Sequence, residues 1–293
     1  MFVVVLSDKP ELRETFCKNN GKEVSKSDVA IYSANITDKK IWLVDPTHYP
    51  EKIQPLLYSL SMADYVVFLI EGLSPKIGEL LVAINSMKIP NGVIVSPVAI
   101  PTNGTVLDKY EKAPDMKAAM DKVLAASATS SENTFGLVHK TENVASKGHV
   151  AFGALKGGKI KKQDKFFILP SKIDVEVRSI YDGGSELDEL SAVSSFEVSY
   201  KGDLAERGLL VPMRNDFQLE NVVNGRFNKS PFFKDDLHGK IFAYSNMQYV
   251  EGHVTDNDLT LSSPLAFEKG DSILVIDASN QKLRIAGVFQ VKW

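Results

Sequence analysis

The loop at residues 7–15 follows an apolar run at residues 2–6, where a nucleotide-binding protein would carry its phosphate loop. Such a loop needs glycines, so that backbone N–H groups reach the phosphates, with a lysine for their charge and a serine or threonine for magnesium. Here the loop contains no glycine, and Pro10 lacks a backbone N–H. Three carboxylates that would repel phosphate stand on Asp8, Glu11 and Glu14. The sequence therefore predicts that this loop binds no nucleoside triphosphate.

The composition is that of an ordinary globular chain without a dominant charge. Its 293 residues are 44% apolar, and 34 basic residues face 37 acidic ones, for a net charge of −3. The length indicates two domains or more. The charge argues against a globally basic nucleic-acid binder, so any RNA contact must come from a local patch.

The cysteine content and the apolar start bear on the cellular compartment. The single cysteine, Cys17, cannot form an internal disulfide, which suits a reducing cytosol. Residues 1–6 are apolar, but they have no basic leader and are too short for the apolar part of a signal peptide. No apolar run approaches the roughly 20 residues of a membrane helix. We expect a soluble, cytoplasmic protein with no membrane partner.

Strand and helix patterns alternate through the first third of the chain. Continuous apolar runs predict strands buried on both faces, and apolar residues at helical spacing predict the helices between them. The predicted strands are residues 2–6, 29–36, 41–45, 65–70 and 93–95, and the predicted helices are residues 10–19, 51–62, 79–87 and 113–128. The alternation predicts a mostly parallel sheet covered on both faces, with one antiparallel hairpin across residues 37–40.

Helical periodicity disappears after the polar linker at residues 127–133. Short strands separated by turn residues predict closed barrels in the rest of the chain. One β-hairpin is expected over residues 147–164, with Gly157 and Gly158 in its two-residue turn. Further strands are expected at residues 166–169, 173–177, 196–200, 241–244, 249–253, 259–261, 272–276 and 283–291.

Four motifs follow one another in the middle third of the chain. The first is a glycine-rich pattern that ends in the run Lys-Ile-Lys and an aspartate, formed by Gly148, Val150, Gly153, Gly158, Lys159, Ile160, Lys161 and Asp164. Val-Arg-Ser-Ile follows at residues 177–180, Lys-Gly at 201–202 and Glu-Arg-Gly at 206–208. In this order the motifs resemble the second domain of translational GTPases such as elongation factor Tu and SelB. Residues 282–291 resemble the last strand of the third domain of these factors.

The resemblance implies a fold and a division into domains. It implies an α/β G-domain-like parallel sheet followed by two all-β barrels, with domains at residues 1–131, 132–212 and 213–293. It is nearest to the SelB-like elongation factors of methanogenic archaea that are associated with pyrrolysine tRNA. Because the phosphate loop is missing, we expect the G domain to be degenerate.

The sequence Asp-Pro-Thr-His at residues 45–48 resembles the Asp-x-Pro-Gly-His motif of the family, with one position lost. By the same resemblance Arg13 falls where the family has its phosphate-loop lysine, and Thr15 falls near its magnesium-binding hydroxyl. Residues 96–99, Ser-Pro-Val-Ala, replace the guanine-reading motif and offer no carboxylate to the base. We therefore expect neither GTP nor magnesium as a cofactor, and no other metal. The candidate vestiges of the nucleotide site are Arg13, Thr15, Asp45 and His48. Asp45 could instead stabilise a helix N-terminus.

In this family the barrels hold an aminoacylated tRNA, so the resemblance implies tRNA as a partner and the ribosome as a further one. Residues 181–184 stand where the family lines the pocket for the aminoacyl end, although the family's histidine is missing here. Tyr181 could stack on a terminal adenine or lie on a barrel rim, and Arg207 could contact phosphate or pair with carboxylates. The candidate tRNA-binding residues are Arg178, Tyr181, Asp182, Lys201, Arg207, Arg226 and Lys229.

Two other functions stay open at this point. The chain could be an unconventional GTPase in which Arg13 and His48 take part. It could also be a protein-binding adaptor in translation that uses the first domain as a docking surface. Salt-dependent tRNA binding distinguishes RNA recognition from the adaptor, because phosphate contacts weaken as salt rises. In each case we expect a monomer.

Overall fold

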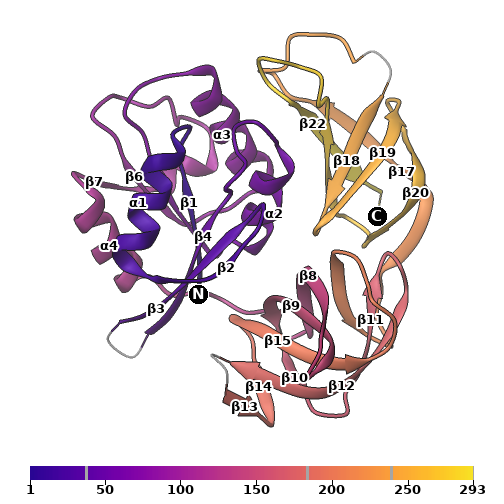
Figure 1. Ribbon diagram of the computed structural model, residues 1–293. Coiled ribbons are helices and arrows are strands. Elements are labelled where there is room, and N and C mark those ends of the chain that lie inside the picture. The colour runs from indigo at the N-terminus through magenta and orange to yellow at the C-terminus, as the bar shows by residue number, and fades with distance from the viewer. Residues whose placement is uncertain (37–38, 183–184, 238–239, 293) are drawn as a thin grey trace. The chain divides into compact units, whose positions relative to one another are not determined.

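The first sheet has seven strands in the order β2-β3-β4-β1-β5-β6-β7 in the computed structural model, which describes residues 1–36, 39–182, 185–237 and 240–292 (Figure 1). The strands are β1 (Phe2–Leu6), β2 (Lys22–Lys26), β3 (Ala30–Ile36), β4 (Lys39–Asp45), β5 (Tyr65–Leu69), β6 (Gly92–Val95) and β7 (Glu111–Ala113). Strands β4, β1, β5, β6 and β7 run parallel, whereas β3 is antiparallel to β4, and β2 is antiparallel to β3. The mostly parallel sheet and the hairpin β3–β4 confirm the prediction; Thr37 and Asp38 of its turn lie outside the described residues.

In the described residues, three α-helices and one 3-10 helix connect these strands, and a fourth α-helix follows β7. They are α1 (Pro10–Asn20), α2 (Gln54–Met62), α3 (Pro75–Ser86), α4 (Met116–Ala125) and η1 (Val106–Lys109). Proline stands in the first turn of α1, α2 and α3, where a missing N–H costs nothing. The Ser74 hydroxyl and the Asp115 carboxylate accept backbone N–H bonds at the starts of α3 and α4.

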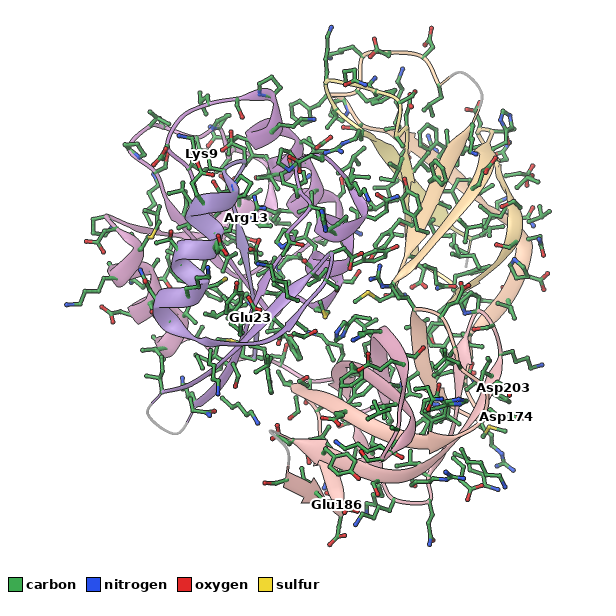
Figure 2. All side chains as sticks on the ribbon, viewed as in Figure 1. Lys9, Arg13, Glu23, Asp174, Glu186 and Asp203 are labelled. Carbon is green, nitrogen blue, oxygen red and sulfur yellow. The ribbon has the colours of Figure 1, made fainter. Side chains whose placement is uncertain are left out.

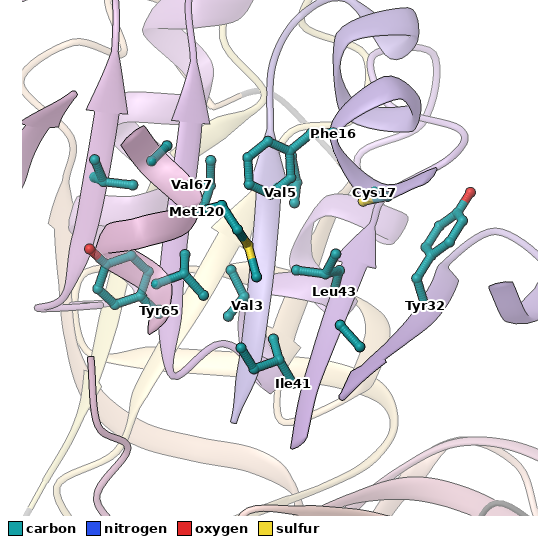
Figure 3. Packing of buried hydrophobic residues seen from close by; sticks show 14 of the residues in the cluster. Val3, Val5, Phe16, Cys17, Tyr32, Ile41, Leu43, Tyr65, Val67 and Met120 are labelled. Carbon is teal, nitrogen blue, oxygen red and sulfur yellow. The ribbon is translucent and has the colours of Figure 1, made fainter. Parts of the chain in front are cut away.

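Helices α1 and α4 cover one face of this sheet (Figure 3). Phe16 and Cys17 of α1 and Met120 of α4 pack with Val3 and Val5, alternate residues of β1. The remaining residues of β1 are equally buried, and α2 contacts this strand. Burial raises the pKa of the Cys17 thiol, so this cysteine is a core residue and not a reactive one.

The second sheet closes into a barrel in the order β11-β16-β8-β9-β15-β12, because β11 also pairs with β12. Its strands are β8 (Phe135–Val144), β9 (Gly148–Gly157), β11 (Lys165–Leu169), β12 (Ile173–Asp182), β15 (Ser194–Lys201) and β16 (Gly208–Pro212). Alternate residues of these strands, such as Phe196, Val198 and Tyr200, form the barrel core. Strand β13 (Ser185–Leu187) pairs antiparallel with the end of β12, while β10 (Lys159–Lys161) and β14 (Glu189–Ser191) form a separate ribbon.

The hairpin predicted over residues 147–164 is wrong. Strand β9 pairs with β8 and β15, and β10 pairs with β14, so the strands on either side of Gly157-Gly158 are not partners. The two glycines are required by close approach instead. A Cβ on Gly157 would lie 2.1 Å from the Asn133 carbonyl oxygen, and one on Gly158, whose φ is +61°, would lie 2.0 Å from Thr134 Oγ1. The chain leaves the barrel sheet here instead of folding back along it.

The third sheet is a closed barrel in the order β17-β20-β19-β18-β21-β22. Its strands are β17 (Gln218–Lys229), β18 (Ile241–Ser245), β19 (Gln248–Val254), β20 (Asp258–Phe267), β21 (Ser272–Ile276) and β22 (Ile285–Val291). The five strands after β17 confirm the predicted positions. Strand β17 was not predicted, because only Val223 and Gly225 of its twelve residues are buried and no regular alternation marks it.

Contacts along the chain define two compact units. The first consists of residues 1–128, 229–238 and 274–288, and the second of residues 129–228, 239–273 and 289–293. Strand β8 begins shortly after Ser131, and β16 ends at Pro212. Within the described ranges, no helix is long and apolar enough to cross a membrane.

Candidate functional site

The side chain of Arg13 lies inside the first unit, next to the loop after β1, where a nucleotide-binding protein carries its phosphate loop. Arg13 sits on α1 (Figure 2) and is 0% exposed. Its Nε donates to Asp45 Oδ1 at 2.7 Å, and its Nη1 donates to the Ser7 carbonyl at 2.6 Å. Its Nη2 donates to the carbonyls of Pro46 and Tyr49, at 3.0 and 2.8 Å. The guanidinium therefore joins the loop after β1 to the segment after β4.

These contacts make the site suited to a cation. A phosphate needs N–H groups that point towards it, whereas here three carbonyl oxygens and a carboxylate point at the guanidinium. Burial raises the pKa of Asp45 above its ordinary range, although the charge and hydrogen bond of Arg13 act against the shift. The Arg13 charge thus opposes the effect of burial and favours the ionised Asp45 carboxylate.

The loop after β1 is also tied to the connection between β5 and α3. The Ser74 hydroxyl donates to the Asp8 carboxylate at 2.7 Å. Lys9, labelled in Figure 2, forms an ion pair with Glu71, and its backbone N–H donates to the Ser7 hydroxyl at 3.2 Å. The charged groups of this loop are therefore engaged with protein groups.

The other two candidate vestiges do not join this cluster. Thr15 and His48 are both exposed, whereas Tyr49, next to His48, is fully buried. The structure therefore unites Arg13 with Asp45, and Asp45 pairs with this arginine in place of a helix N-terminus. Tyr49 was not predicted, because a lone tyrosine after a strand carries no sequence signal of its role. In the described part of the chain, no three His, Cys, Asp or Glu side chains are grouped to hold a metal ion.

A second cluster lies on β12, β15 and the turn between β8 and β9. Lys147 Nζ lies 3.8 Å from the ring centroid of Tyr181, and the same ammonium forms an ion pair with Glu197. Tyr181 and Glu197 face each other across the β12–β15 pair. The Ser199 hydroxyl donates to the Lys147 carbonyl at 2.7 Å and so holds the turn on β15. One face of the Tyr181 ring is thus covered by a cation.

Arg178 and Asp182 belong to the same part of the barrel. Arg178 is exposed, and its Nη1 lies 3.9 Å from where a Cβ on Gly148 would stand, next to Lys147. Asp182 ends β12 one residue after Tyr181; Gly183 and Gly184 of the expected pocket lie outside the described residues. Lys201 pairs in register with Glu176, towards the other end of β12, so it does not join this cluster.

The remaining candidates lie on other elements. Arg207 is half-buried and its Nε donates to the His139 carbonyl at 2.7 Å, so it fastens the segment before β16 to β8. Arg226 is exposed on β17. Lys229 ends that strand, with Nζ 5.7 Å from the Phe233 ring centroid and 3.7 Å from an oxygen of Asp236.

The basic run of the first motif is neutralised by acidic side chains. Lys159 and Lys161 both form ion pairs with Glu189 across the β10–β14 ribbon. Lys162 forms ion pairs with Glu186, which is labelled in Figure 2, and with Asp188. Hydrogen bonds from Lys162 lower the pKa of Glu186. This ribbon therefore does not present a net positive surface to RNA.

Comparisons with known proteins agree on the architecture. No family model matches the sequence. An uncharacterized protein of Methanocaldococcus jannaschii is 25% identical, over 92% of this chain and 94% of its own length. The crystal structure of translation elongation factor SelB from Methanococcus maripaludis with the GTP analogue GppNHp superimposes with a TM-score of 0.79 at 15% identity. That match covers 100% of this chain and 79% of SelB.

The chain has the fold of the SelB elongation factors. A bacterial selenocysteine-specific elongation factor, EF-Sec, superimposes with a TM-score of 0.77 at 17% identity and covers 98% of this chain. The chain spans 58% of the length of that bacterial factor. The SelB-like fold agrees with the α/β sheet and two barrels expected from the sequence.

Proposed function

We propose that this chain is a SelB-like translation factor homologue that binds aminoacylated tRNA through its barrels and neither binds nor hydrolyses GTP. The buried Arg13 guanidinium supports the proposal that the chain neither binds nor hydrolyses GTP. It donates to the carbonyls of Ser7, Pro46 and Tyr49 and to the Asp45 carboxylate. A nucleotide would have to displace this internal cation from four acceptors that have no affinity for phosphate.

The surrounding loop supports the same reading. Neither GTP nor magnesium is part of this proposal, because the loop after β1 has no glycine and its Asp8 and Lys9 are held by Ser74 and Glu71. Titration of the whole chain with GTP and with GDP, each with magnesium, tests this by calorimetry. We expect no heat of binding up to millimolar nucleotide. Micromolar affinity for either nucleotide would refute the loss of the nucleotide site.

The cluster around Tyr181 is the best-placed RNA contact among the candidates. An exposed arginine, a lysine and an aromatic ring lie together there, and RNA-binding surfaces use this combination to contact phosphates and stack bases. Lys147 covers the ring of Tyr181, so a base that stacks on that face must displace the ammonium. We infer that the exposed Arg178 contacts phosphate and that Tyr181 contacts the terminal base or the amino acid.

Filter binding of tRNA at several salt concentrations tests this inference. Arg178→Ala should weaken binding by about tenfold and reduce the slope of log K against log salt by about 0.7–0.9. Lys161→Ala is the matched control, because its charge is already paired with Glu189 on the separate β10–β14 ribbon, and it should leave the slope unchanged. Affinity that does not vary with salt would refute RNA recognition.

The proposal also covers which tRNA is bound, the cellular compartment and the oligomeric state. We propose a cytoplasmic monomer that meets its tRNA at the ribosome, with pyrrolysine tRNA as the first substrate to test. Charged and uncharged pyrrolysine tRNA, compared with a selenocysteine tRNA and an alanine tRNA, show whether the amino acid is read. Equal affinity for charged and uncharged tRNA would remove aminoacyl recognition from the proposal.

A protein-binding adaptor is the second candidate function, and one observation favours it. Leu73 and Val98 are 65% and 40% exposed in the loops that follow β5 and β6, at the edge of the sheet where a nucleotide would bind. Exposed apolar side chains at one edge are a feature of protein-binding surfaces. The unconventional GTPase is disfavoured, because Arg13 is fully buried while His48 is exposed.

A further inference from the structure

A second buried arginine of the first unit binds α3. Glu79 is 0% exposed, and both carboxylate oxygens are engaged by Arg284. The Arg284 backbone N–H and Nε each donate to Glu79 Oε2 at 2.9 Å, and Nη2 forms an ion pair with Oε1. Burial acts to raise the pKa of Glu79, but the hydrogen bonds and charge of Arg284 outweigh it and hold the pKa below its ordinary value. Glu79 is therefore ionised and fully paired.

Tyr49 connects this pair to the Arg13 cluster. Its carbonyl accepts from Arg13 Nη2 at 2.8 Å, and its hydroxyl lies 3.3 Å from Glu79 Oε1 and 3.0 Å from the Lys76 carbonyl. The guanidinium carbon of Arg284 lies 5.7 Å from the centroid of the Tyr49 ring. One residue thus touches both buried arginines, through its main chain on one side and its side chain on the other.

The segment around Tyr49 is held along its whole length. We call residues 46–51 the latch segment. Arg13 binds its Pro46 and Tyr49 carbonyls, and Arg284 Nη1 donates to its Glu51 carbonyl at 3.3 Å. Within the segment, the Tyr49 N–H donates to the Pro46 carbonyl at 3.0 Å, and the N–H of Lys52, the next residue after the segment, donates to the His48 carbonyl at 2.8 Å.

We propose that the latch segment is held permanently in one conformation by Arg13 and Arg284, with no bound ligand, so that the first unit has a single state. The proposal rests on the proposed function, in which no nucleotide binds. A segment switches only if a second arrangement is close in free energy. Release of the latch segment would break the Arg13 donations to the Pro46 and Tyr49 carbonyls, the Arg284 donation to the Glu51 carbonyl and the contacts of the buried Tyr49 hydroxyl. Each hydrogen bond lost in a buried site is costly, so release is unfavourable. The second arrangement is therefore not populated.

The consequence concerns the regulation of RNA binding. A ligand shifts a conformational equilibrium only through its different affinities for two states. With one state present, the affinity for tRNA does not depend on GTP or GDP, and residues 274–288 remain joined to α3 through Arg284. The chain then binds its RNA constitutively, and release must come from competition or dilution and not from a nucleotide cycle.

Hydrogen exchange of the whole chain tests the latch. In the wild type, the amides of Tyr49 and Lys52 should exchange at least about a hundredfold more slowly than those of the exposed residues Val98 and Ala99, equally with and without GTP or GDP. Glu79→Gln should raise exchange across residues 46–53 by about tenfold or more. Glu71→Gln, the same substitution in an exposed ion pair, should change it by less than about twofold.

The other outcomes overturn the latch, the proposed function, or both. Fast exchange of residues 46–53 in the wild type, or unchanged exchange in Glu79→Gln, would overturn the latch. If Glu79→Gln does not fold, Tyr49→Phe is the alternative variant, because it keeps the ring and removes only the hydroxyl. It should raise the exchange of residues 46–53 about threefold, and an unchanged rate would overturn the latch. Slow exchange in a wild-type chain that fails to bind tRNA would refute the proposed function alone, and nucleotide-dependent exchange would refute both.

Discussion

Replacing Arg13 by alanine tests whether the buried guanidinium stabilises the first unit. The substitution removes the ion pair with Asp45 and three hydrogen bonds to main-chain carbonyls. It leaves the Asp45 carboxylate, whose side chain is 6% exposed, without a counter-charge. Truncation of one partner of a buried pair costs about 3–5 kcal/mol. In a domain of about 150 residues each kcal/mol lowers Tm by about 2–4 °C, so the expected loss is about 6–20 °C.

The measurement is urea unfolding followed by tryptophan fluorescence. The chain has two tryptophans, and Trp42 on β4 is buried in the core of the first unit. In a Trp293→Phe background, Trp42 therefore reports on the first unit alone. The expected result is a lower midpoint with an unchanged slope, since the substitution changes stability and not the surface exposed on unfolding.

The double variant Arg13→Ala/Asp45→Asn separates the orphaned charge from lost packing. If the cost comes from the buried carboxylate, the double variant should be more stable than Arg13→Ala alone. Without Arg13 the main opposition to the effect of burial is lost, so the pKa of Asp45 rises further and the folded state takes up a proton more readily than the unfolded one. The loss in Arg13→Ala should therefore be larger at pH 8 than at pH 5.

Three results would contradict this reasoning. The first is an Arg13→Ala chain that unfolds within about 1 kcal/mol of the wild type, which is the effect of an average substitution. The second is a double variant no more stable than the single one. The third is a loss that does not depend on pH.

Two further predictions concern stability. Because the pKa of Glu79 is lowered in the folded chain, its stabilisation is complete above the unfolded pKa of about 4.3 and is lost as pH falls through the folded pKa. The gap between the wild type and Glu79→Gln in urea unfolding should shrink below that pH, and a constant gap would refute the paired carboxylate. Gly158→Ala should lower the stability of the second unit by about 2 kcal/mol or more, since the position combines positive φ with contact to Thr134. Gly148→Ala is the control, since φ is +74° there too but the only atom near the added Cβ is Arg178 Nη1, at 3.9 Å. It should cost less in calorimetry, and equal losses would show that the close approach to Thr134 is unimportant.

Sequence patterns predicted strands correctly where the burial of side chains follows a regular local period. The apolar runs of β1 and β5 and the alternation in β12 and β15 mark strands, because side-chain burial repeats every residue or every second residue. They failed where burial has no regular period. Strand β17 is largely exposed, and β2 has no buried residue, so neither stood out from its loops.

Pairing was less predictable than strand position. Gly157-Gly158 between two strands suggested a tight turn, yet the strand partners lie elsewhere in the chain. A local sequence reports the conformations a backbone can adopt, but the partner of a strand depends on which distant segment lies beside it. The same limit applies to Arg207, whose hydrogen-bond partner is the His139 carbonyl, 68 positions away.

The sequence by itself determined the order of sheet and barrels, and it determined that the first loop lacks the glycines of a phosphate site. Only the tertiary structure decided what occupies that place. Arg13, Tyr49 and Arg284 are separated by 36 and 235 positions, and no spacing rule links them. Their roles come from burial, because a charge removed from water must find its partners wherever the fold supplies them.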